Sequence, residues 1–225
     1  MNIVKDNQFT GATETIETYS PAVVEFARLH AGGRASETER AVGLYYAVRD
    51  QIRYDPYRID LTTDGMRAST TLSNRHGWCV SKAILLAACC RSMGIPARLG
   101  FADVRNHLST ERMRERMQTD IFYWHGYTEI LLESNWVKAT PAFNIELCER
   151  FGLLPLEFDG LSDSLYHPYD REGNRHMEYV RHRGTYSDLP LEEIIQTFRQ
   201  EYRFRRAESD LNHASFDEDV KRETS

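Results

Sequence analysis

Apolar positions recur at helical spacing in the first quarter of the chain. Residues 20–32 begin with Ser-Pro and end in Gly, which predicts a first helix with a defined start and stop. A second helix follows at once, because Ser36 and Glu39 have the spacing of a capping box. Apolar residues from 41 to 52 then repeat every three or four positions. We expect both helices to be packing elements.

The most apolar stretch of the chain is CVSKAILLAACCRSMG, residues 79–94. Nearly every position between Ala83 and Cys90 is small or apolar, a pattern typical of a helix that is buried on all sides. Gly94 predicts a left-handed cap at its C-terminus, and Pro96 prevents the helix from continuing. Residues 54–74, which precede this helix, are rich in Thr, Ser and Asp and predict an irregular surface connection.

A region of β-structure is predicted after the buried helix. Residues 98–104 form its first strand, and the charged insertion 106–120 that follows predicts a short exposed helix. Residues 123–139 then predict a β-hairpin, because side chains in its first half alternate between two faces. We assign the turn to Ser134 and Asn135, which are common turn residues.

The C-terminal third is less regular. Residues 152–188 are aromatic and rich in loop formers, which suits either a lid over a site or plain surface packing. An amphipathic helix is predicted from Leu191 to Tyr202, and the charged tail from Phe216 onward is expected to fray. No internal repeat or linker is evident. We therefore predict one α+β domain, 1–225, with a core at about 20–150 and a C-terminal extension, 151–225, that is loop-rich and then helical.

Composition limits the class of protein. The chain has 225 residues, a formal net charge of -6 and 41% apolar residues, and it has no apolar run long enough to cross a bilayer. Its N-terminus lacks the pattern of a secretory signal, so we expect a cytoplasmic protein without a membrane partner. The acidic balance argues against nucleic acid as a partner. The sequence leaves the oligomeric state open.

Four cysteines are too few for a disulfide scaffold, so reduced thiols are expected. No His or Cys pairs show the spacing of a zinc site, and we predict neither a metal nor a cofactor. Cys89 and Cys90 lie in the middle of the buried helix and fit core packing. No further feature of the sequence around Cys148 points to a role for it.

Cys79 is different, because it stands at the start of the buried helix. Unpaired N–H groups and the positive end of the helix dipole favour a thiolate there and predict a lowered pKa. Its own N–H would donate to an oxyanion, and Gly77 would let a substrate carbonyl approach the backbone. Asn74, Trp78 and Tyr57 are candidates for a second donor. The alternative is that Cys79 is simply a small buried side chain.

A catalytic thiol needs a base, and His125 is preferred among the eight histidines. His125 lies near the start of a strongly β-patterned segment, which would hold it rigidly. Its neighbours are Trp124, a large side chain for packing, and Gly126, which leaves a gap for substrate.

Two blocks of the sequence carry a family pattern. GWCVSKAILLAACCRSMGIPARLGFADV and, after the insertion, HGYTEILLESNWVKATPAF resemble the core of the transglutaminase-like superfamily of papain-like cysteine enzymes. The resemblance covers about Tyr54 to Phe143. It implies a catalytic helix packed against an antiparallel sheet, with Cys79 as the nucleophile and His125 as the general base.

The third member of the implied catalytic group departs from this family pattern. The family usually has an Asp about four residues after the Trp of the second strand, and this sequence has Thr140 there. If Ser134 and Asn135 form a two-residue turn, strand pairing places Asn144 opposite His125. Papain-like enzymes do use Asn in this role. Thr140 is favoured by alignment and Asn144 by chemistry, and both stay candidates.

The resemblance implies a cysteine-dependent acyl-transfer enzyme that works through a thioester. Hydrolysis of a peptide, isopeptide or side-chain amide is the first expectation, and transfer to an amine is the second. The substrate would be a peptide or protein amide. Calcium dependence is not expected, because no EF-hand-like carboxylate loop is present. The alternative, motivated by Thr140 in place of Asp, is a catalytically inactive binding module that keeps the fold.

Overall fold

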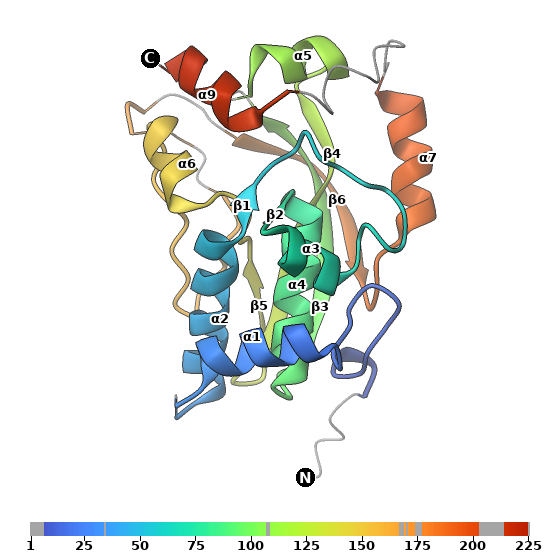
Figure 1. The fold of residues 1–225 in the computed structure, drawn as a ribbon, viewed down its shortest axis with the longest axis vertical. Helices are drawn as coiled ribbons and strands as arrows, with labels where there is room; N and C mark the ends of the chain where they lie inside the picture. The colour runs from blue at the N-terminus through green and yellow to red at the C-terminus, as the bar shows by residue number, and fades with distance from the viewer. Residues whose placement is uncertain are drawn as a thin grey trace.

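A four-stranded antiparallel sheet with one long helix across its face forms the centre of the structure (Figure 1). The computed structural model describes residues 7–33, 35–106, 109–166, 169, 171–173, 177–202 and 214–224. The strands are, in spatial order, β5 (Asn135–Ala139), β4 (Ile121–Leu132), β3 (Ala97–Asn106) and β6 (Met177–Tyr186). Helix α4 (Cys79–Ser92) packs against β3 and β4. The predicted α+β class, with a helix on an antiparallel sheet, is confirmed.

Helix α4 is buried along nearly its whole length, as its sequence predicts. Every residue from Cys79 to Arg91 is buried. The predicted left-handed cap is present, because Gly94 has φ +75°. The N–H of Gly94 donates to the carbonyl of Arg91 at 3.0 Å, and that of Ile95 donates to the carbonyl of Cys90 at 3.0 Å. Both ends of α4 are therefore fixed.

Helices α1, α2 and α3 cover α4 on the side away from the sheet (Figure 1), and α3 is described below. Helices α1 (Pro21–Ala31) and α2 (Glu37–Gln51) occur where the sequence predicts them. The capping box is formed, since Ser36 Oγ accepts from the Glu39 N–H and Glu39 Oε2 accepts from the Ser36 N–H, both at 3.0 Å. A short 3-10 helix, Asn7–Phe9, precedes them.

Helix α3 (Ala68–Asn74) lies within the segment predicted to be irregular, so that prediction is wrong in part. Its sequence, ASTTLSN, is small and polar and has little helical signal of its own. Burial of Ala68, Thr71 and Leu72 against neighbouring helices stabilises it instead. On either side of α3, β1 (Arg53–Tyr54) and β2 (His76–Gly77) pair in parallel.

The β4–β5 hairpin is confirmed, but its turn lies one residue earlier than predicted. Glu133 and Ser134 form the turn with φ of 49° and 70°, while Asn135 is already paired with Leu132. Two consecutive left-handed residues match the twist of the strands. The register brings Ile130 opposite Val137, both buried, so the apolar face of the hairpin decides the turn.

Strand β6 was not predicted. It pairs with β3 at the edge of the sheet and carries two register irregularities. Most of its side chains are exposed or half-buried, so it lacks the alternation that marks a strand in sequence. Helix α7 (Leu191–Glu201), which follows, is confirmed.

The charged tail forms a helix, α9 (Phe216–Thr224), where fraying was expected, so that prediction is wrong. Phe216 and Val220 are buried. Asp219 accepts a hydrogen bond from the Tyr57 hydroxyl at 2.8 Å and one from Nε of Arg112 at 2.7 Å. Long-range contacts therefore stabilise a segment whose local composition favours solvent.

The predicted helix in the charged insertion is α5 (Glu111–Met117), and its Met113 and Met117 are buried. Helices α5 and α9 lie at the same end of the molecule, at the top of Figure 1, and the Arg112–Asp219 ion pair joins them. Helix α6 (Ile145–Arg150) follows β5.

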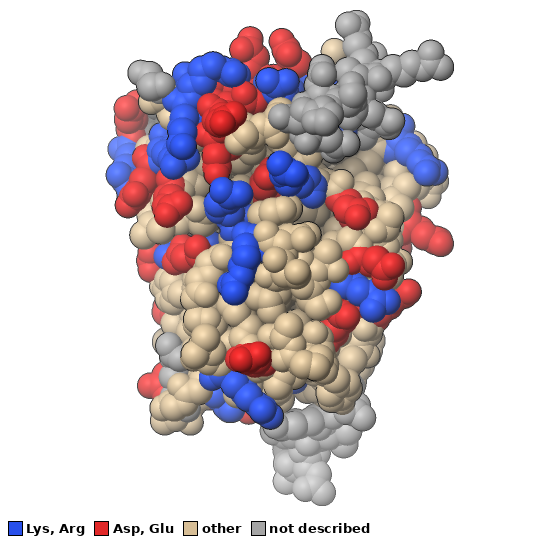
Figure 2. Space-filling view, viewed as in Figure 1, with Lys and Arg blue, Asp and Glu red and all other residues tan. Residues whose placement is uncertain are grey.

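Charges of both signs are interspersed on the face seen in Figure 2, most densely toward its upper part, and much of the centre is uncharged. Among the residues that the structure describes, no helix is long and apolar enough to cross a membrane.

Candidate active site

Cys79 is the first residue of α4, and its thiol is almost completely enclosed. The backbone N–H groups of Gly126, Val80 and Cys79 itself interact with the sulfur and favour its charged form. Burial has the larger effect and raises the pKa of the Cys79 thiol to about 11. The lowered pKa predicted from the helix N-terminus is wrong for the chain without substrate, because desolvation outweighs the N–H groups. The thiol is therefore protonated at neutral pH.

Gly77 does not open a path for substrate, contrary to the sequence-based expectation. A Cβ on Gly77 would lie 2.4 Å from Oγ of Ser81 and 3.1 Å from Cγ2 of Thr71. Ser81 Oγ in turn accepts from the N–H of Trp78 at 3.1 Å. The space beside Gly77 is filled by the side chain that caps α4, so this glycine serves internal packing.

A close crossing of β4 over the first turn of α4 brings His125 toward Cys79. A Cβ on Gly126 would lie only 2.9 Å from Cα of Val80. Since Gly126 follows His125 and Val80 follows Cys79, the two candidate side chains leave the backbone beside this contact. Both line the same cavity.

A bulge in β4 lies directly before His125. The register between β3 and β4 shifts between residues 102 and 104, and Trp124 has a left-handed backbone with φ 60°. The N–H of Trp124 donates to Oδ1 of Asp103 at 3.1 Å, and Nε of Arg183 donates to the same oxygen at 2.6 Å. Bulges can redirect neighbouring side chains, and His125 directly follows this one.

We call the space that holds the thiol the cysteine cavity. It has a volume of about 230 Å³, and Cys79 and His125 form part of its wall. The rest of the wall is mostly aromatic and includes Tyr54, Tyr57, Trp78, Phe122, Tyr123, Phe198 and Tyr202. Cys79 and His125 thus face an apolar enclosure rather than open solvent.

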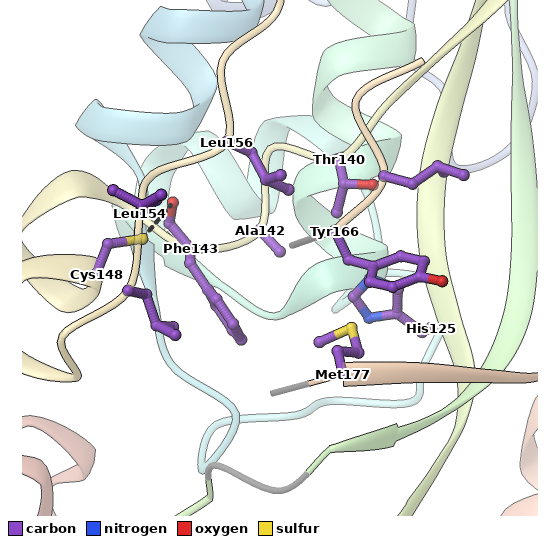
Figure 3. A pocket seen from close by; sticks show the side chains of 11 residues that line it. His125, Thr140, Ala142, Phe143, Cys148, Leu154, Leu156, Tyr166 and Met177 are labelled. Carbon is purple, nitrogen blue, oxygen red and sulfur yellow. Dashed lines mark hydrogen bonds between the residues drawn. The ribbon is translucent and has the colours of Figure 1, made fainter. Parts of the chain in front are cut away.

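A second, smaller space also borders His125, and we call it the threonine cavity (Figure 3). It has a volume of about 20 Å³ and is lined by His125, Thr140, Cys148 and apolar side chains of the segment 142–177. Thr140 is buried, and its Oγ1 has no hydrogen-bond partner among the described residues. The imidazole of His125 therefore borders both the cysteine cavity and the threonine cavity.

Cys148 lies in the threonine cavity and not in the cysteine cavity. Its thiol donates to the carbonyl of Phe143 at 3.9 Å, and burial raises its pKa to about 11. Cys89 and Cys90 are fully buried in the middle of α4, as predicted. Part of segment 152–188 packs around the threonine cavity, and residues 167, 168, 170 and 174–176 of it lie outside the described residues.

Asn144 is not opposite His125, so the pairing inferred from the sequence is wrong. Because the hairpin turn begins at Glu133 and β5 ends at Ala139, the ladder does not reach residue 144. Asn144 instead occupies the N-cap of α6, where Oδ1 accepts the N–H of Tyr54 at 3.1 Å. It lines neither cavity.

Sequence reasoning missed two residues beside the thiol. Burial raises the pKa of Tyr54, and the nearby Cys79 adds to that rise. Burial likewise raises the pKa of Tyr202, again with a contribution from Cys79. Tyr54 arrives through the pairing of β1 with β2, where it lies opposite Gly77, and no local pattern marks it. Tyr202 was visible only as the last apolar position of a predicted helix.

The candidates for a second oxyanion donor separate clearly. The hydroxyl of Tyr57 already bonds to Asp219 and Thr110, and Asn74 does not line the cysteine cavity. Trp78 does line it, and its buried Nε1 has no hydrogen-bond partner in the described part of the chain.

Comparisons with known proteins place this arrangement in context. The family model of the Transglutaminase-like superfamily matches residues 24–141. No curated protein matches the chain. A solved structure described as a candidate cysteine protease from Cytophaga hutchinsonii is similar with a TM-score of 0.46 and 16% identity. That similarity covers 79% of this chain and 53% of the other, so the chain spans about half of that protein's length. A candidate protease from Parabacteroides distasonis is similar with a TM-score of 0.40 and 14% identity, over 60% of this chain and 26% of that one.

Proposed function

The chain belongs to the transglutaminase-like superfamily, and we propose that it is a cysteine-dependent acyl-transfer enzyme. Cys79 is the proposed nucleophile, and His125 is the proposed general base and acid. One observation carries the proposal: both side chains line the same cavity, beside the close crossing of α4 and β4. A thiol and an imidazole brought together in an enclosed space are the parts that acyl transfer through a thioester needs.

The reaction has two halves. In the first, Sγ of Cys79 bonds to the carbonyl carbon of an amide while His125 takes the thiol proton. The carbon–nitrogen bond then breaks, and His125 gives the proton to the leaving amine, which leaves a thioester on Cys79. In the second half, water or another amine attacks the thioester, and His125 takes its proton and returns it to the departing sulfur.

The raised pKa of Cys79 decides how the thiol is activated. With a pKa of about 11, very little thiolate exists at neutral pH before substrate binds. The proton must therefore leave as the sulfur attacks, which makes His125 necessary for acylation rather than merely helpful. A dry, apolar wall also strengthens every charge interaction in the transition state.

The proposed oxyanion site uses the N–H of Cys79, which as the first helical residue has no acceptor within α4. Trp78 Nε1 and the Tyr54 hydroxyl are the proposed side-chain donors, since both residues line the cavity. Loss of one oxyanion donor costs a factor of about 10² to 10³ in rate. Thr140 is the proposed neutral residue that orients His125 from the threonine cavity.

Hydrolysis of a peptide, isopeptide or side-chain amide is the first reaction we propose, and transfer to an amine is the second. Both proceed through the same thioester and differ only in what resolves it. Water needs no binding site of its own, whereas an acceptor amine must enter beside a cavity that already holds the acyl group.

Acylation by p-nitrophenyl acetate tests the proposal. We expect a burst of nitrophenolate and one acetyl group on Cys79, located by peptide mass spectrometry. The burst is expected to vanish in Cys79→Ala and to fall by a factor of about 10² or more in His125→Ala. Cys148→Ala is the matched control, because Cys148 is equally buried but lines only the threonine cavity. It should keep the burst.

The rival function is a binding module that retains the fold without catalysis. The specific observation in its favour is that Thr140 puts a neutral side chain where a charged one would stabilise imidazolium. In a module of this kind, p-nitrophenyl acetate would acetylate Cys79 no faster than an ordinary buried thiol, and the rate would not depend on His125. That result would overturn the enzymatic proposal.

A further inference from the structure

We propose that the cysteine cavity selects acyl groups that carry one large apolar side chain, aromatic ones above all, beside the reactive carbonyl. This inference rests on the proposed function, because it takes Cys79 as the acylated atom. It adds the chemical class of the substrate.

The wall offers apolar surface with few polar groups to spare. The Tyr57 hydroxyl is engaged by Asp219 and Thr110, and the Tyr123 hydroxyl donates to Glu201 at 3.1 Å. The Tyr202 hydroxyl accepts the Tyr123 N–H at 2.9 Å. Trp78 Nε1 and the Tyr54 hydroxyl also line the cavity, but they are the proposed donors to the oxyanion. A polar acyl side chain, such as a glutamine amide, would lose its water and find few other partners here, a costly exchange.

The size of the cavity fits one side chain. Its volume of about 230 Å³ lies below the roughly 300–1,000 Å³ of sites that enclose a whole drug-sized ligand. A single large side chain beside the reactive carbonyl matches this space better than a stretch of peptide does. Small side chains such as that of glycine would leave much of it unfilled and forgo the contacts.

The far wall comes from outside the segment that matches the family model. Phe198 and Tyr202, at the C-terminal end of α7, stack on each other with ring centroids 4.8 Å apart. Phe198 also packs on Trp78 at 6.0 Å, and Tyr202 packs on Tyr123 at 5.5 Å. Helix α7 is thus joined to the residues flanking Cys79 and His125, so the C-terminal extension shapes the acyl site.

Helix α5 also contributes to the wall, through Met113 and Met117, both buried. Thioether side chains adapt to irregular apolar groups and make favourable contacts with aromatic rings. The charged side chain in the wall is Arg116, which is half-buried at the edge of the same helix. An acidic acyl side chain is therefore the rival substrate class to be tested.

Chloromethyl ketones of N-acetyl-phenylalanine, N-acetyl-glycine and N-acetyl-aspartate provide the test. Each reacts by forming a bond between Sγ and the methylene carbon as chloride leaves, with the thiol proton going to His125. We expect the phenylalanine probe to label Cys79 about tenfold or more faster than the glycine probe, measured as kinact/KI with site assignment by mass spectrometry. Equal rates, or preference for the aspartate probe, would overturn the inference.

Two test variants and one control variant sharpen the experiment. Phe198→Ala is expected to reduce the preference for phenylalanine over glycine several-fold. Ile194→Ala is the matched control, because Ile194 is buried on the same helix but does not line the cavity. Leu61→Trp enlarges a half-buried side chain of the cavity wall, so it should slow the phenylalanine probe while sparing the glycine probe.

The outcomes separate this inference from the proposed function. If the glycine probe labels Cys79 rapidly and in a His125-dependent way without any preference for phenylalanine, the function stands and the substrate class is wrong. If no probe labels Cys79 faster than it labels the unfolded chain, the function itself fails.

Discussion

Gly126 on β4 lies so close to Val80 on α4 that a Cβ on the glycine would be 2.9 Å from Val80 Cα and 3.0 Å from its Cγ2. The nearer of these atoms belongs to the backbone, so a change of rotamer cannot relieve the contact. Each residue directly follows one member of the proposed reactive pair. The separation of Cys79 and His125 is thereby set by two backbones in contact, a rigid arrangement that suits acyl transfer.

Gly126→Ala should therefore damage acylation more than folding. The added methyl group must push β4 away from α4 by some tenths of an ångström, and a misplacement of this kind can cost up to about 10² in rate. Overpacking should cost about 1–3 kcal/mol of unfolding free energy. The burst with p-nitrophenyl acetate and urea denaturation measure the two effects.

Gly94→Ala is the matched control for this change. It lies at the other end of α4, where φ is +75° and no atom blocks a Cβ, so it adds strain without touching the site. We expect it to lower stability by about 1 kcal/mol and to leave acylation intact. If both variants acylate equally well, the crossing does not set the geometry of the pair.

The sequence was most informative where local pattern and burial agree. Helix α4 could be predicted because its composition is apolar throughout and its C-terminal glycine fits only a left-handed cap. Cys79 could be singled out by its position on that helix, and His125 by the strongly patterned strand. The family match to residues 24–141 agrees with the resemblance read from about Tyr54 to Phe143.

The remainder depends on contacts that no local pattern records. Most side chains of strand β6 are exposed or half-buried, and α9 is held by Asp219 through partners that lie more than 100 residues away in sequence. The pKa of Cys79 depends on burial by distant segments. The position at the helix N-terminus alone therefore predicted a lowered pKa where burial raises it. A one-residue shift of the hairpin turn was enough to misplace Asn144.

Asp103→Asn should disturb His125 through the bulge. Asp103 accepts the Trp124 N–H and pairs with Arg183; the Asp103 side chain is buried, at 4% exposure, and the Arg183 side chain is half-buried, at 14%. Removing one charge leaves Arg183 uncompensated, which we expect to cost about 3 kcal/mol of unfolding free energy. Acylation should fall as well, since the left-handed backbone of Trp124 loses an ionised acceptor.

The double variant Asp103→Asn/Arg183→Met tells these two effects apart. With both charges gone, the unfolding free energy should recover in large part, whereas acylation should stay low because the bulge still lacks its carboxylate. Full recovery of acylation together with stability would mean that Asp103 has no part in directing His125.

Lys82 should make stability depend on pH. Its buried Nζ donates to the carbonyl of Arg49 at 2.9 Å and to that of Ile52, and burial lowers its pKa to about 7. In the unfolded chain the pKa is about 10.4. Between these values the unfolded state binds more protons, so this group makes stability rise with pH from about 7 to about 10, with no further change below pH 7.

Lys82→Met should remove that dependence while keeping the volume of the side chain. The difference in unfolding free energy between the wild type and the variant is therefore expected to shift in favour of the wild type as pH rises through this window. Urea denaturation across the window measures it. A difference that stays constant with pH would show that Lys82 titrates at the same pH in the folded and unfolded states.

Thr140→Val tests the neutral orienting residue directly. Valine has nearly the same shape, and the hydroxyl it removes is buried without a partner among the described residues, so stability should be unchanged or slightly higher. If Oγ1 accepts a hydrogen bond from His125 once the imidazole is protonated during acylation, a bond that the chain without substrate does not make, acylation should fall by about tenfold, the scale of one neutral hydrogen bond. Ser164→Ala is the control, a buried hydroxyl at the same end of β5 that lines neither cavity. An equal burst in both variants would mean that the imidazole is held by the bulge and the helix crossing alone.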